Sequence, residues 1–187
     1  MKYDPSKRHR RSIRLKGYDY TQPGVYFITL VTHNRQCLFG DIAAGGGIML
    51  NAIGEIAYEE WKKSAEIRRE MKLDEFIIMP NHVHGIVMIL GDDAGPGGAH
   101  GRAPLLRPPK SLGAFVAGFK SVVTKRINIL RAMPGVPVWQ RNYYEHIVRG
   151  EADLARIRTH TRNNPARWAL DQLYPTALPN LFNQDQL

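Results

Sequence analysis

Cysteine is almost absent from this chain of 187 residues, since Cys37 is its single one. One cysteine excludes an internal disulfide framework and is typical of proteins from a reducing compartment. Long apolar runs are also missing. The first 25 residues hold no stretch of the kind found in a signal peptide, and no later segment approaches the roughly 20 apolar residues of a membrane helix. These absences predict a cytoplasmic protein, and a length of 187 residues fits one globular domain.

Acidic residues are missing from residues 94–144, although that stretch carries eight lysines and arginines. Residues 2–16 are also strongly basic, and the whole chain has a net charge of +9. A solvated basic surface is one interpretation, but two separate basic blocks in a small domain favour a nucleic-acid partner. The candidate contacts are Lys7, Arg8, Arg10, Arg11, Arg14, Lys16, Lys120, Lys125, Arg126 and Arg141.

The spacing of apolar residues predicts a basic arm over residues 1–20, a domain over 21–171 and a tail over 172–187. Strands are expected at 24–33, 72–79, 82–90 and 143–148, and helices at 51–69, 111–131 and 151–163. Asn51 and Ser111 are candidate helix N-caps. The order β-α-β-β-α-β predicts an α+β fold with a ferredoxin-like split β-α-β sheet, helices on one face and an additional C-terminal helix. The strand at 82–90 is then central.

A histidine pair lies on that central strand, in the segment Pro80-Asn81-His82-Val83-His84. Side chains alternate along a strand, so His82 and His84 share one face while Val83 points into the core. Two imidazoles on one face of a strand make half of a metal site, and a structural pair is the alternative.

The helix at 151–163 offers candidates for completing this site. His160 and Asn164 are four residues apart and share a helix face. If that helix packs across the sheet, the Asn164 amide oxygen completes a His-His-Asn set suited to Mg²⁺ or Mn²⁺. The alternatives are that Asn164 caps a short helix at 165–170 and that His160 faces solvent.

Three segments together resemble a known family: residues 79–84, 138–149 and 163–168. They are similar to the REP-associated tyrosine transposases, a bacterial branch of the HUH-class single-strand DNA transposases with one catalytic tyrosine. The likeness extends from about Gly17 to Asp171. It implies a bacterial, nucleoid-associated protein that binds single-stranded or hairpin DNA, as a monomer or a homodimer.

The resemblance also implies a reaction and its residues. His82, His84 and Asn164 would hold a divalent ion that orients the scissile phosphate. A helix tyrosine would attack it, forming a 5′-phosphotyrosine link and freeing a 3′-hydroxyl, so that strands are nicked and rejoined. At the tyrosine's position, however, this chain has His160, and no tyrosine lies between Glu151 and Trp168.

Three hypotheses address the missing tyrosine: loss of covalent chemistry with DNA binding kept, use of Tyr143 or Tyr144, or direct attack by His160. Core packing and base stacking are alternative roles for the two tyrosines. The functional predictions are therefore a transposase-type endonuclease and strand transferase, or a DNA-binding relative without cleavage. An RNA-binding split β-α-β module with a structural histidine pair is a third possibility. It is disfavoured because histidines occupy the strand positions where stacking rings belong.

Overall fold

A computed structural model describes residues 17–91 and 110–177. Its central feature is a four-stranded sheet made of β1 (Gly24–Val31), β4 (Met71–Met79), β5 (His82–Ile89) and β6 (Tyr144–Ile147). The strands lie in the order β4-β5-β1-β6, and each neighbouring pair is antiparallel. The strand that carries the histidine pair is central, as predicted.

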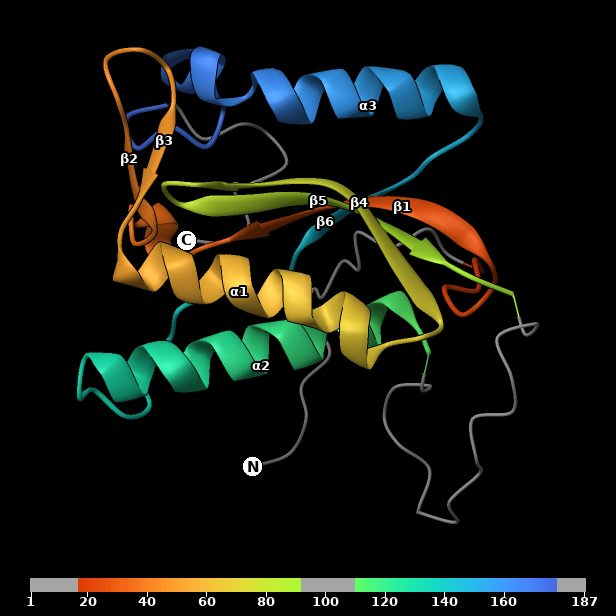
Figure 1. Cartoon of the computed structure of the whole chain (residues 1–187), viewed down its shortest axis with the longest axis horizontal. Coiled ribbons are helices and arrows are strands. Elements are labelled where there is room, and N and C mark those ends of the chain that lie inside the picture. The colour runs from red at the N-terminus through yellow and green to blue at the C-terminus, as the bar shows by residue number, and fades with distance from the viewer. Residues whose placement is uncertain (1–16, 92–109, 178–187) are drawn as a thin grey trace, which may run out of the picture.

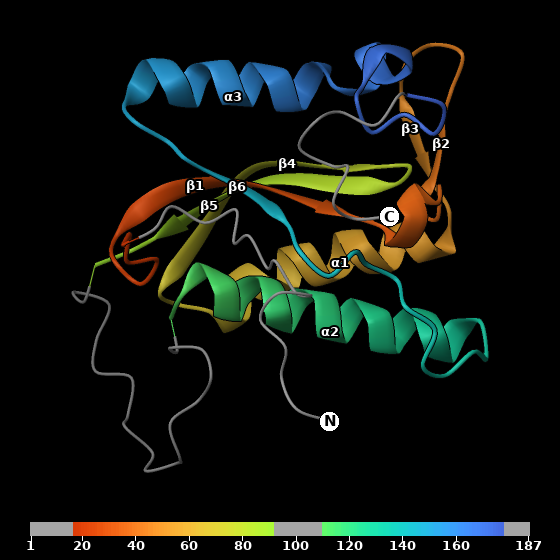
Figure 2. The same cartoon turned by 180° about the vertical axis from the view of Figure 1, so that it is seen from behind.

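Three helices cover the two faces of this sheet. Helices α1 (Ala52–Ile67) and α2 (Leu112–Leu130) lie together against one face, and α3 (Glu151–Asn163) crosses the other (Figure 1). The view from behind also shows the sheet between α3 on one side and α1 with α2 on the other (Figure 2). The predicted caps are confirmed: Asn51 Oδ1 accepts hydrogen bonds from two backbone amides of α1, and Ser111 Oγ accepts one in α2.

Alternating side chains give the sheet two different faces. Val83, Val87 and Ile89 of β5 point to one face of the sheet and pack in the main core beneath α1 and α2, as predicted for Val83. The opposite face has a smaller cluster in which Phe27 and Ile86 meet α3. Gly85 lets Trp61 of α1 lie directly on the main-core face, because an added Cβ would come 2.1 Å from Trp61 Cζ2.

The structure contains several short elements that the sequence analysis did not predict. A hairpin of β2 (Gly40–Ile42) and β3 (Ile48–Leu50) brackets the Gly45-Gly46-Gly47 turn, and a 3₁₀ turn, η1 (His33–Arg35), follows β1. Strands of three residues are too short to show a period of two, which explains why the pattern missed them. The short helix considered after Asn164 exists as η3 (Pro165–Leu170).

The ends of the predicted domain can be placed only in part. Most of the arm at 1–20, residues 92–109 and the end of the tail lie outside the described residues. Tyr20 is buried against the main core, and its ring lies 5.9 Å from that of Tyr26. Within the described part of the chain, no helix has the length and apolar character needed to cross a membrane.

Candidate metal centre

His82 and His84 both point from β5 toward the α3 side of the sheet. Their exposed fractions are 0% and 5%, and their ring centroids are 4.4 Å apart. The pair is therefore removed from bulk water, and its ring nitrogens need partners other than bulk water.

Asn81 determines the tautomer of His82. The Asn81 amide nitrogen donates to the carbonyl oxygens of Arg35 and Leu173, at 3.1 and 2.7 Å. Its Oδ1 therefore faces His82 Nδ1, at 2.9 Å, and can only accept a hydrogen bond. Nδ1 must carry the proton, so Nε2 of the neutral ring presents a lone pair. A ligand histidine is oriented in this way by a second hydrogen bond.

His84 has an equivalent support on the neighbouring strand. Its Nδ1 lies 2.9 Å from Thr29 Oγ1 on β1, and these residues are directly paired in the sheet. Both rings are thus held through Nδ1, which leaves Nε2 as the nitrogen available to a ligand.

Both histidines are neutral at physiological pH. Burial lowers the pKa of His82 to about 3, and proximity to His160 lowers it further while the Asn164 amide opposes the shift. Burial also holds the pKa of His84 well below its ordinary value, with additional contributions from His82 and His160. Neutral imidazole is the form that binds a metal ion.

Asn164 lies beside the pair, and its side chain does not cap η3. It is 3% exposed, and its Nδ2 donates to Asp171 Oδ2 at 2.9 Å. Its Oδ1 is buried with no hydrogen-bond partner among the described residues, and the same holds for His82 Nε2. Buried polar atoms are rarely left unpaired, so two in one place require an explanation. Asn164 occupies the predicted N-cap position of η3, but its side chain makes no capping hydrogen bond there.

Asp171 is the site residue that sequence reasoning missed. Ligand atoms of His82, His84 and Asp171 all lie within 4.8 Å of one another, the one such group among residues 17–91 and 110–177. Asp171 follows η3, and no fixed spacing relates it to a strand 80 or more residues earlier. The sequence signal was only that a carboxylate follows Asn164 within a short distance.

The donor set fits a divalent cation. Two imidazole nitrogens, a carboxylate and an amide oxygen form a mixed nitrogen and oxygen ligand set of the kind that binds divalent metal ions. An ion at this position would also satisfy both unpartnered atoms, His82 Nε2 and Asn164 Oδ1.

The three candidate nucleophiles are placed very differently. His160 is exposed on α3, and its ring centroid is 5.4 Å from that of His84. Tyr144 is 55% exposed and pairs with Thr29, so it faces the metal side from two strands beyond His84, about 10 Å at the usual strand spacing. Tyr143 packs against the main core on the opposite face of the sheet.

The basic residues predicted to contact nucleic acid lie in different parts of the structure. Lys120 and Arg141 line one cleft, and Lys125 is exposed on α2. Arg126 is held by Glu59 and Glu60 of α1, with a distance of 2.7 Å to each. The candidates of the arm lie outside the described residues: Lys7, Arg8, Arg10, Arg11, Arg14 and Lys16.

Comparison with known proteins adds a family and a fold. No family model matches the chain. An uncharacterised protein of Haemophilus influenzae is 38% identical over 178 residues, which cover 92% of this chain and 97% of that protein. A REP-associated tyrosine transposase bound to a REP hairpin superposes with a TM-score of 0.54 and 14% identity, over 87% of this chain and 77% of that one.

A provisionally assigned transposase of Deinococcus radiodurans R1 gives a TM-score of 0.40 with 18% identity, over 81% of this chain and 97% of that one. The chain belongs to the family of the Haemophilus influenzae protein, and its fold is that of the REP-associated tyrosine transposase.

Proposed function

We propose that this protein binds single-stranded or hairpin DNA and, with Mg²⁺ or Mn²⁺ at the centre described above, nicks and rejoins it. The observation that carries the proposal is the pair of buried, unpartnered atoms His82 Nε2 and Asn164 Oδ1 beside the Asp171 carboxylate. The hairpin bound by the transposase of similar fold supports DNA as the substrate. The order β4-β5-β1-β6 supports a ferredoxin-like description of the sheet.

Each residue of the centre has a separate task in this proposal. His82 presents an Nε2 lone pair because its Nδ1–H donates to Asn81 Oδ1, and His84 presents one when its Nδ1–H donates to Thr29 Oγ1. Asn164 and Asp171 add oxygen ligands. A bound divalent ion supplies Lewis acidity toward a phosphate oxygen.

His160 is the nucleophile that the geometry favours. It lies one helical turn before Asn164, is open to solvent and has its ring against His84. Attack by an imidazole nitrogen on phosphorus would form a P–N bond and release the 3′ oxygen as a hydroxyl. Rejoining would reverse the step, with the 3′-hydroxyl displacing the imidazole.

DNA binding without cleavage is the second candidate. It is favoured by the absence of any tyrosine in α3 and by the position of Tyr143 on the far face of the sheet. The metal centre would then clamp a phosphate without breaking a bond.

A covalent-adduct assay tests the proposal and separates the two candidates. A labelled hairpin oligonucleotide with a single-stranded extension is incubated with the protein and Mn²⁺, then resolved on a denaturing gel. We expect a protein-linked band that His160→Gln abolishes and that Tyr143→Phe, Tyr144→Phe and the control Tyr58→Phe retain. Because a phosphorus–nitrogen link is cleaved by mild acid and a phosphotyrosine link is not, acid treatment identifies the bond independently.

Two results would reject parts of the proposal. Hairpin binding without an adduct, over a range of divalent ions, selects the binding candidate. Tight binding of an RNA hairpin with no binding of the DNA hairpin would reject DNA as the substrate.

A further inference from the structure

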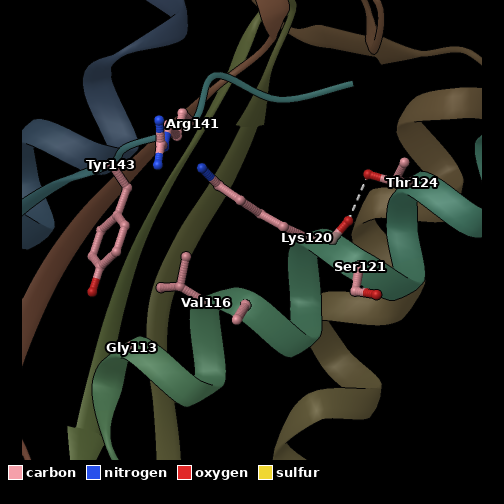
Figure 3. A pocket seen from close by; sticks show the side chains of 8 residues that line it. Gly113, Val116, Lys120, Ser121, Thr124, Arg141 and Tyr143 are labelled. Atoms are coloured by element: carbon pink, nitrogen blue, oxygen red, sulfur yellow. Dashed lines mark hydrogen bonds between the residues drawn. The ribbon is translucent and has the colours of Figure 1, made fainter. Parts of the chain in front are cut away.

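A second candidate site lies on the opposite face of the sheet from the metal centre. It is a cleft of about 400 Å³ between α2 and the segment leading into β6. Figure 3 shows Lys120 reaching from α2 toward Arg141, with the Tyr143 ring beside them and Ser121 further along the helix. Val116 lies behind these polar groups and packs in the main core.

The charge of the cleft is of one sign. None of its lining residues is acidic, while Lys120 and Arg141 are both cationic. Arg141 is exposed and has no hydrogen bond or ion pair with any described residue. Two neighbouring cations repel each other, and an anion bound between them would offset this repulsion by attracting both.

Lys120 positions Arg141 over the cleft. Its Nζ donates to the carbonyl oxygens of Gln140 and Asn142, both at 2.8 Å, and so clamps the backbone on either side of residue 141. Its ammonium also lies 6.0 Å from the centre of the Tyr143 ring. The Arg141 guanidinium and the Tyr143 ring therefore lie on the same side of Lys120, along the cleft (Figure 3).

We propose that this cleft binds one nucleotide of a single strand, with its phosphate on Arg141 and its base on the Tyr143 ring. Guanidinium suits a phosphate because its N–H groups form parallel hydrogen bonds, and an aromatic ring accepts any base. The inference rests on the proposed function, since it takes a DNA strand as the ligand.

The position of the cleft gives this strand a route to the metal centre. β6 is an outer strand of the sheet, and Tyr143 and Tyr144 point to opposite faces at its start. A strand held at Tyr143 can pass around the β6 edge and meet the exposed Tyr144 on the metal side. The cleft would thus hold the single-stranded segment next to a hairpin.

The test compares two arginine variants of the full chain. Arg141→Gln removes the proposed phosphate contact, and Arg69→Gln is the control, an exposed arginine outside the cleft. Binding of a labelled oligothymidine is followed by fluorescence anisotropy in EDTA at several salt concentrations. We expect Arg141→Gln to weaken binding about tenfold, as for loss of a charged hydrogen bond. The slope of log K against log salt should fall by about 0.7, the single-strand value for one phosphate.

A second pair of variants tests the base contact. Tyr143→Phe keeps the ring and should bind oligothymidine as the wild type does, whereas Tyr143→Leu should bind more weakly. Thermal melts verify that each variant is folded.

The outcomes separate this inference from the proposed function. Equal binding by Arg141→Gln and Arg69→Gln overturns the cleft while leaving the metal centre intact. A wild-type protein that binds no DNA overturns the proposed function, and the strand assignment of the cleft falls with it. Arg141-dependent binding of thymidine monophosphate, at an affinity equal to that of the oligomer, would overturn the strand in favour of a free nucleotide.

Discussion

At the scale of single residues, the metal centre depends on hydrogen bonds that do not touch the metal. Asn81 can orient His82 because two backbone carbonyls fix its own amide. Thr29 supports His84 from the next strand. Such supporting contacts typically change metal affinity 10- to 100-fold when removed.

Thr29→Val tests this support with little change in shape. The hydroxyl at 2.9 Å from His84 Nδ1 is lost, while the side-chain volume is nearly preserved. We expect Mn²⁺ affinity to fall at least about tenfold in titration calorimetry. Asn163→Ala is a suitable control, since this exposed asparagine lies on α3 outside the centre. Unchanged affinity in Thr29→Val would show that His84 needs no partner on Nδ1.

The buried histidines also predict how stability depends on pH without metal. The pKa of His82 is about 3 in the folded chain and about 6.5 when unfolded. Unfolding therefore takes up a proton between these values, and the free energy of unfolding falls as the pH is lowered from about 6.5 toward 3. Each such histidine contributes about 1.4 kcal/mol per pH unit.

Urea unfolding in EDTA from pH 7 to pH 4 measures this slope. His82→Gln should have a shallower slope than the wild type by about one proton, because the carboxylates titrate equally in both proteins. If the two slopes coincide, His82 is not held neutral by the fold.

At the scale of secondary-structure elements, a β-bulge determines where α3 lies. The β4–β5 register shifts between Leu73 and Phe76, which adds one residue to β4. The extra residue allows Asp74 and Glu75, adjacent in sequence, both to meet α3. Asp74 Oδ2 accepts from Arg158 at 2.6 Å, and Glu75 pairs with Arg162 one turn later. Since Asn164 follows α3 directly, these pairs also place a ligand.

A double-mutant cycle with Arg158→Gln and Asp74→Asn tests this contact. Both side chains are partly buried, at 31% and 17% exposure, so we expect a coupling of about 1 kcal/mol in unfolding free energy. Arg158→Gln should also weaken Mn²⁺ binding, whereas Arg68→Gln, which breaks contacts on the other face, should affect only stability. Additive effects in the cycle would rule out the pair as an anchor.

The sequence predicted the elements whose signal is local. The histidine strand, three helices and the caps Asn51 and Ser111 follow from periodicity and capping chemistry, which depend on neighbouring residues. Thr29 and Asp171 could not be assigned because they reach the histidines through strand pairing and through the turn after η3. Asn81 is next to His82 in sequence, but its orientation depends on the distant carbonyls of Arg35 and Leu173. Asn164 could be predicted only in part. The sequence predicted the helix that precedes it, but left two roles open for its side chain, a metal ligand or a helix cap.

At the scale of the whole molecule, metal binding should stabilise the fold. The cluster joins β5 to Asn164 and Asp171, which lie on either side of η3, and unfolding separates these segments. A ligand at 100 times its Kd adds about 2.7 kcal/mol, or about 5–10 °C in Tm for a chain of this size.

Differential scanning calorimetry with Mn²⁺ and then with excess EDTA measures this shift. We expect a higher Tm with Mn²⁺, a return with EDTA, and no shift for His84→Gln. An equal shift in His84→Gln would place the bound ion elsewhere on the protein.

Because side chains alternate between the two faces of β5, mutations on this strand should cause two different defects: loss of the metal ion or loss of the folded protein. Even-numbered positions 82 and 84 carry the centre, and odd-numbered positions 83 and 85 carry the packing, where Gly85 admits Trp61. A saturation scan of this strand, scored once for abundance in cells and once for metal retention, would show two interleaved profiles. Conservative changes at positions 82 and 84 would leave an abundant protein without its ion, while changes at positions 83 and 85 would deplete the protein itself.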